Sequence, residues 1–80
     1  MNREELVAKI NSALAEEFEV EESEITPDAN VKDTLQIDSL GLVDLVALLE
    51  SDFGFKVQGS ELAQVKTFGA LYDFVAAKAA

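Results

Sequence analysis

An apolar stripe near the middle of the chain limits its fold more than any other feature. The stripe has five members, and each is three or four residues from another, as on one face of a helix: Leu42, Leu45, Val46, Leu49 and Phe53. Gly54 follows, as glycine commonly does just beyond a helix. We therefore predict a helix that Asp38 caps, that ends at Phe53 and that buries one face in a core.

Two other segments have the same periodicity. The first runs from Asn2 to Phe18, with Asn2 in a capping position and acidic residues in the first turn, where they suit the helix dipole. The second begins at Thr67, and its inward-facing residues are Phe68, Leu71, Tyr72, Val75 and Ala76. Between the central and the last helix, Ser60 is expected to cap one or two helical turns within residues 60–65.

The connection over residues 19–37 is long for a chain of 80 residues. Pro27 disfavours a helix at Thr26, and scattered apolar residues are expected to hold this loop against the core: Val20, Ile25, Val31, Leu35 and Ile37. No segment is predicted to form a sheet. We expect one all-α domain over residues 1–80, a small antiparallel bundle of three main helices plus one short helix, with a long first loop.

The composition excludes several classes of function. The chain has no cysteine and no histidine, so it lacks disulfides, thiolate ligands and the commonest general base. The stretch that begins at Asp28 starts like a calcium loop, but Lys32 and Asp33 stand where an oxygen ligand and a glycine are needed. A nucleophile elbow around Ser39 is excluded because Ile37 replaces its first glycine. We predict no metal site, no catalytic residue and no enzymatic activity.

The chain is strongly acidic, with 16 acidic and 6 basic residues and a net charge of −10 at pH 7. Such a charge repels nucleic acids and anionic lipids, and it attracts basic protein surfaces. No stretch approaches the roughly 20 apolar residues of a membrane span, and the start does not resemble a signal peptide. We expect basic protein partners, neither nucleic-acid binding nor membrane insertion, and a monomer in the cytoplasm.

The tripeptide Asp38-Ser39-Leu40 at the start of the central helix admits two interpretations. Asp is a favoured cap and Ser is common in first turns, so the motif can be a helix start alone. Alternatively, a phosphodiester on Ser39 would lie at the positive end of the helix dipole. A second apolar strip of Leu40, Val43 and Ala47 follows, within residues 33–55 that contain five acids and no lysine or arginine. These surroundings favour a docking surface at an attachment site.

The chain resembles the phosphopantetheine-binding acyl carrier proteins over nearly its whole length. The resemblance rests on Asp38-Ser39-Leu40, on Val43-Asp44-Leu45-Val46, on Leu49 to Gly54 and on the spacing from Val57 to Val75. It implies that a separate phosphopantetheinyl transferase, using Mg²⁺, attaches the arm of coenzyme A to the Ser39 hydroxyl. Asp38 would then help to place the metal and the pyrophosphate.

The same resemblance implies roles for other residues. The thiol of the arm would carry an acyl group as a thioester, which fits a functional chain without cysteine. The acyl chain would be sheltered among Leu45, Val46, Leu49, Phe53 and Leu62. Acyl-transfer and chain-elongating enzymes with basic surfaces would dock on Leu40, Val43, Asp44, Ala47 and Glu50.

The cargo and the pathway are left open by the residues. We place fatty acid biosynthesis slightly ahead of a related lipid or polyketide pathway. However, Gly41 stands where fatty-acid carriers usually have an acidic residue, which makes a specialised carrier credible. An activated amino acid such as D-alanine is an alternative cargo. A rival from another class is an unmodified acidic interaction domain, in which Leu40, Val43 and Ala47 bind a partner and Ser39 only caps the helix.

Overall fold

The three apolar stripes of the sequence form the three long helices of the fold. The computed structural model describes residues 2–79, apart from the side chains of Ser39 and Ala79. The long helices are α1 (Arg3–Phe18), α3 (Ser39–Phe53) and α5 (Phe68–Ala79). Shorter segments between them are the 3-10 turn η1 (Glu22–Glu24), α2 (Val31–Leu35) and α4 (Gly59–Leu62). No strand occurs within residues 2–79, so the predicted all-α class is confirmed.

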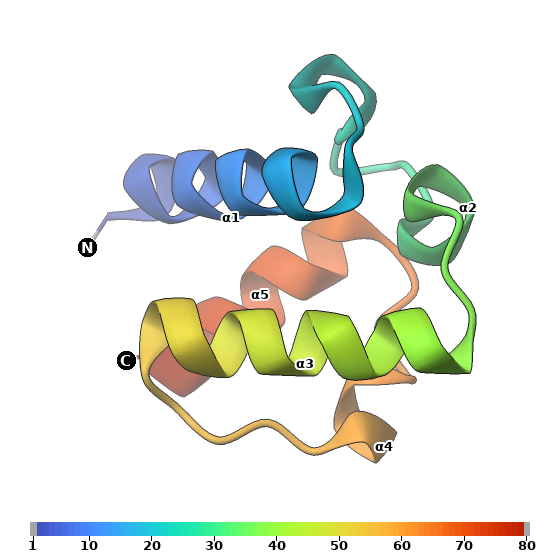
Figure 1. Ribbon diagram of the computed structural model, residues 1–80. Helices are drawn as coiled ribbons and strands as arrows, with labels where there is room; N and C mark the ends of the chain where they lie inside the picture. The colour runs from blue at the N-terminus through green and yellow to red at the C-terminus, as the bar shows by residue number, and fades with distance from the viewer. Residues whose placement is uncertain (1, 80) are drawn as a thin grey trace.

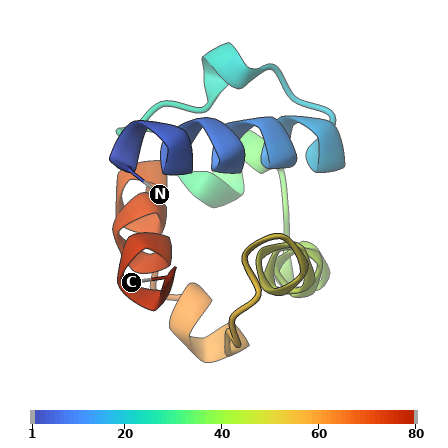
Figure 2. The same cartoon turned by 90° about the vertical axis from the view of Figure 1, so that its left-hand side faces the viewer.

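The long helices pack around one core and are inclined to one another. α1 and α3 run in opposite directions across Figure 1, while α5 passes behind α3. Figure 2 views α3 end-on, with α1 crossing above both α3 and α5 and with α4 on the side of α3 away from α1. Each long helix contributes buried side chains to the shared core, among them Leu14 of α1, Leu49 of α3 and Phe68 of α5.

Short polar side chains start the long helices. The Asn2 side chain accepts a hydrogen bond from the Glu5 N–H at 2.8 Å, and the Thr67 hydroxyl accepts one from the Ala70 N–H at 3.2 Å. Both contacts satisfy backbone donors that lack a partner within the helix. At the other end of α3, Gly54 adopts the left-handed conformation, with φ of 72°. These starts and this end agree with the sequence prediction.

The long first loop contains helical turns that the sequence analysis did not predict. Val31 and Leu35 are both buried and lie one turn apart in α2, which Asn30 caps by accepting from the Asp33 N–H at 3.0 Å. The start of α2 is also held from outside, because the Val31 N–H donates to the Lys66 carbonyl at 2.9 Å. The predicted attachment of the loop to the core is confirmed for Ile25, which is 4% exposed.

The short helix before α5 begins earlier than predicted, and Ser60 does not cap it. α4 starts at Gly59, and its cap is Gln58. The Glu61 side chain accepts a hydrogen bond from the Gln58 N–H at 3.3 Å, and the Glu61 N–H donates to the Gln58 backbone carbonyl at 3.1 Å. The sequence analysis therefore assigned the capping role to Ser60, which lies in the first turn of α4, instead of to Gln58, which precedes the helix.

Candidate functional site

The predicted attachment residue begins α3. Oδ1 of Asp38 accepts hydrogen bonds from the Leu40 N–H at 3.0 Å and from the Gly41 N–H at 3.2 Å. The Asp38 carbonyl accepts the first bond of the helix ladder, from the Leu42 N–H at 3.0 Å. Asp38 is thus the cap, and Ser39 is the first helical residue, at the positive end of the dipole. The Ser39 side chain itself lies outside the described part of the structure.

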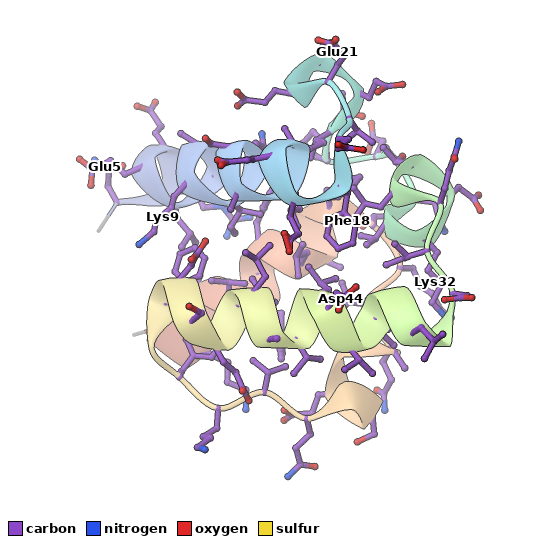
Figure 3. The ribbon with its side chains drawn as sticks, viewed as in Figure 1. Glu5, Lys9, Phe18, Glu21, Lys32 and Asp44 are labelled. Carbon is purple, nitrogen blue, oxygen red and sulfur yellow. The ribbon has the colours of Figure 1, made fainter. Side chains whose placement is uncertain are left out.

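The residues predicted for docking lie along α3 with different exposures. Leu40 is 77% exposed and Val43 is 63% exposed, which makes both unusual among the large apolar residues of this chain. Asp44 and Ala47 are exposed as well, and Figure 3 shows Asp44 along the edge of α3 that is nearer α1 in that view. An apolar strip with acidic neighbours therefore begins directly beside Ser39.

Glu50 differs from the other predicted docking residues because it already has a partner within the fold. Its side chain is half-buried, and its Oε2 accepts a hydrogen bond from the Val57 N–H at 2.9 Å. This contact ties the connection between α3 and α4 to the last turns of α3. The docking role predicted for Glu50 stays a prediction.

An apolar cavity of about 250 Å³ lies between α3 and α4. It is lined by Leu42, Val43 and Val46 of α3 and by Gly59 of α4. The sequence analysis named Val46 as a lining residue, gave Val43 a docking role only, and missed Leu42 and Gly59. The spacing of Leu42 from Ser39, three residues along a helix, is a signal that could have identified it.

The other four residues predicted to shelter the acyl chain do not line this cavity. Leu45, Leu49 and Leu62 are each 1% exposed and belong to the core. Phe53 lies at the far end of α3, where the Lys9 ammonium nitrogen is 4.7 Å from the centre of its ring. Lys9 comes from the side of α1 that faces α3 (Figure 3), and its Nζ also donates to the Asp52 carbonyl at 2.9 Å. The predicted role of these four residues stays a prediction.

α4, which forms one wall of the cavity, is held to both neighbouring helices. The Glu50 contact described above holds the connection that leads into it. On the other side, Lys78 of α5 forms an ion pair with Glu61, with 3.1 Å between Nζ and Oε1. Hydrogen bonds from the Lys78 ammonium and the Gln58 N–H hold the pKa of the Glu61 carboxyl below its ordinary value.

Within residues 2–79 no group of three or more acidic side chains is placed to hold a metal ion. Among the same residues, no helix is both long enough and apolar enough to cross a membrane.

Comparisons with known proteins place this site in a family. A family model described as the phosphopantetheine attachment site matches residues 8–75. The acyl carrier protein of Thermotoga maritima is 40% identical over 77 residues, which cover 96% of this chain and 95% of that protein. The chain belongs to the acyl carrier protein family.

Other acyl carrier proteins agree in sequence and in fold. That of Rubrobacter xylanophilus is 39% identical over 75 residues, covering 94% of this chain and 93% of the relative. The solved structure of the acyl carrier protein from Enterococcus faecalis matches with a TM-score of 0.78 and 29% identity, over 98% of this chain and 99% of that one. The family resemblance seen in the sequence is thereby confirmed. Phosphopantetheine is the prosthetic group for which the matched family model is named.

The residues at the start of α3 fit a phosphopantetheine group in this acyl carrier chain. The neighbouring Leu40 is largely exposed, so the start of the helix is open at the surface. Leu42, Val43 and Val46 follow Ser39 by three, four and seven residues, which places position 39 on the helix face that borders the cavity. An arm that begins at position 39 therefore starts one helical turn from an apolar cavity.

Proposed function

We propose that Ser39 is the attachment residue and that the arm presents an acyl group, held as a thioester, to separate enzymes. The observation that carries this proposal is the alignment, on one face of α3, of Ser39 with the residues that line the apolar cavity. The positive end of the helix dipole favours a phosphodiester there. When bound, the prosthetic group supplies the thiol that this chain lacks.

The modification is a phosphoryl transfer that a partner enzyme performs on this chain. The Ser39 hydroxyl oxygen forms the new bond to the phosphorus of the arm, adenosine 3′,5′-diphosphate leaves, and the hydroxyl proton passes to solvent. We propose that Asp38 helps to place Mg²⁺ during this transfer, since hard cations prefer carboxylate and phosphate oxygens. Its Oδ1 is engaged in capping α3, and its exposed carboxylate remains accessible to a metal that a transferase brings.

The partners that we propose are a phosphopantetheinyl transferase and acyl-transfer and elongating enzymes. A basic rim around an apolar centre would complement Leu40, Val43 and Asp44, which are exposed beside the attachment residue. The chain itself would be a carrier without catalytic residues. The cytoplasmic location and the monomeric state stay predictions.

Mass spectrometry of the intact protein tests the attachment residue. After incubation with coenzyme A, Mg²⁺ and a broad-specificity transferase, the wild-type chain should gain one phosphopantetheine and Ser39→Ala should gain none. Ser51→Ala is the matched control, because Ser51 is an exposed serine of the same helix. A folded wild-type chain that gains no mass would leave Asp38-Ser39 as a helix start alone, and the unmodified interaction domain would replace the proposal.

Asp38→Asn separates the two roles of Asp38 in the same experiment. Asparagine caps helices about as well as aspartate, so the free energy of unfolding should change by less than about 0.5 kcal/mol. The rate of modification should fall nevertheless, because the carboxylate charge is lost. An unchanged rate would show that Asp38 acts only as a cap.

A further inference from the structure

The corner between α2 and α3 contains a strained residue three positions before Ser39. Gln36 ends α2 in the left-handed conformation, with φ of 55° and ψ of 47°. This conformation is unfavourable for a residue with a side chain, whereas glycine adopts it readily. Within the described residues, Glu19 at the end of α1 is the other residue with a side chain at positive φ. Strain of this kind is common at functional sites, so the strained position before Ser39 is a candidate for a functional role.

The surrounding structure imposes the conformation of Gln36. The N–H groups of Gln36 and Ile37 both donate to the Lys32 carbonyl, the second of them at 3.1 Å. Before this corner Leu35 is 4% exposed, and after it Ile37 packs against the core. These contacts explain why the backbone turns here. They do not explain why the position holds glutamine, because glycine would make the same turn without strain.

The Gln36 side chain has no partner among the hydrogen bonds of the described fold. Its carboxamide is exposed, and none of the side-chain hydrogen bonds found within residues 2–79 involves it. The polar residues on either side differ, because the Asn30 side chain caps α2 and the Asp38 side chain caps α3. A carboxamide carries two N–H donors and an acceptor oxygen. Gln36 therefore offers these groups to a binding partner.

Gln36 lies within the area that an enzyme acting on Ser39 covers. Figure 1 shows α2 and the start of α3 at the same end of the molecule, joined by a short connection. Three residues of chain span at most about 11 Å. An interface of standard size covers about 800 Å² of each partner, which corresponds to a circle with a radius of roughly 16 Å. An enzyme surface centred on Ser39 thus extends beyond position 36.

Given the carrier function proposed above, we propose that Gln36 is a specificity-determining residue for the enzyme that modifies Ser39. Its carboxamide forms a hydrogen bond with a neutral polar group of the phosphopantetheinyl transferase. The contact lies on the N-terminal side of Ser39, whereas Leu40 and Val43 follow Ser39 along α3. Because the carboxamide is uncharged, the contact keeps its strength as salt is added, unlike a contact through Asp44.

Steady-state kinetics of the modification test this contact. The assay uses coenzyme A, Mg²⁺ and whichever of a broad-specificity and a carrier-selective transferase has the lower KM for the wild-type chain. Gln36→Ala removes the carboxamide and keeps a Cβ in the strained conformation, whereas Gln36→Gly also removes the strain. In both variants KM for the carrier chain should rise about three- to tenfold, the equivalent of one net hydrogen bond, while kcat stays unchanged. Gln36→Asn keeps a carboxamide and should recover part of the loss.

Glu19→Gly is the matched control for strain. Glu19 ends α1 with φ of 56° and ψ of 46°, nearly the same conformation as Gln36. Gln36→Gly and Glu19→Gly should therefore raise the melting temperature by similar amounts, but Glu19→Gly should leave KM unchanged. The ratio of KM between Gln36→Ala and the wild type should be the same at about 0.05 and about 0.3 M NaCl, whereas the ratio for Asp44→Asn should fall as salt screens its charge.

Three results would overturn the inference. An unchanged KM in Gln36→Ala and Gln36→Gly would show that the carboxamide meets no partner, although the carrier function would stand. An equal rise of KM in Glu19→Gly would assign the effect to the backbone and not to the Gln36 side chain. A fall in kcat without a change in KM would mean that position 36 acts by placing Ser39. If the wild-type chain gains no mass at all, the proposed function fails and this inference fails with it.

Discussion

At the residue scale, the position just after Leu40 shows how one contact excludes a side chain that fatty-acid carriers usually have. A methyl group on Gly41 would lie 2.5 Å from the Cβ of Ile37 and 2.7 Å from its Cγ2, well inside van der Waals contact. Ile37 is half-buried and packs against the core, so it is not free to move away. An acidic side chain at position 41 is therefore unfavourable beside isoleucine at position 37. The departure of Gly41 from the usual pattern has a steric cause.

We expect Gly41→Ala to destabilise the chain although alanine is the better helix former. The gain in helix propensity is about 0.5–1 kcal/mol, whereas overpacking typically costs about 1–3 kcal/mol, so the net loss should be about 1 kcal/mol. In an Ile37→Ala background the clash is removed, and the same change at Gly41 should stabilise by about 0.5–1 kcal/mol. Urea unfolding of the four proteins measures this coupling. Strictly additive effects would contradict the steric explanation.

At the element scale, the short helix α4 depends on a carboxylate that titrates. The folded chain holds the pKa of Glu61 below its ordinary value of 4.5, mainly through Lys78. The stabilisation is therefore complete above about pH 4.5 and is lost as the pH falls through the lower pKa of the folded state. Glu61→Gln keeps a residue suited to the capping box but removes the charge. It should be slightly less stable than the wild type at pH 7, and the two should converge in acid.

Thermal melts of both proteins from pH 7 to pH 3 measure this convergence. Lys78→Gln is the control, because it removes the ammonium whose hydrogen bond is the main cause of the lowered pKa of Glu61, while Glu61 stays in place. In the Lys78→Gln background, Glu61→Gln should change the pH dependence of the melting temperature far less than it does in the wild type. A difference between wild type and Glu61→Gln that stays constant down to pH 3 would show that the carboxylate contributes through shape and not through charge.

The elements differ in how far the sequence predicts them. The long helices were predictable because each has a continuous apolar face and a start of its own, as Asn2 and Thr67 show. α2 could not be predicted, because five residues give little periodicity and because the start of this helix depends on the distant Lys66 carbonyl. At the site, the cap Asp38 could be predicted from local pattern. The position of Gly59 in the lining of the cavity could not be predicted, because it depends on where α4 lies against α3.

At the scale of the whole molecule, most of the negative charge has no counter-charge nearby. The chain carries a net charge of −10 within a body of 28 × 26 × 20 Å. The Debye length is about 30 Å at 0.01 M salt and about 10 Å at 0.1 M, so screening across the molecule begins in this range. Three carboxylates gather in a hollow between α1 and α3, whose lining includes Glu16, Glu17 and Asp52. One base lies beside it, because the Lys9 ammonium donates to the Asp52 carbonyl.

We therefore expect the melting temperature to rise with NaCl, most steeply between about 0.01 and 0.15 M. A gain of about 1 kcal/mol corresponds to roughly 4–8 °C for a domain of this size. Differential scanning calorimetry in a series of NaCl concentrations measures this rise, and a melting temperature that is independent of salt would contradict it.

The double variant Glu16→Gln/Glu17→Gln locates the repulsion. Both residues lie in the last turns of α1, where negative charge opposes the helix dipole, so neutralising them should raise the melting temperature at low salt and reduce its salt dependence. Glu4→Gln/Glu5→Gln removes the same charge from the first turn of α1, where the dipole favours it. This control should lose about 0.3–1 kcal/mol per residue from the dipole, which offsets what it gains from reduced repulsion. If both pairs stabilise the chain equally, net charge alone governs its stability, and the placement of carboxylates between α1 and α3 is without consequence.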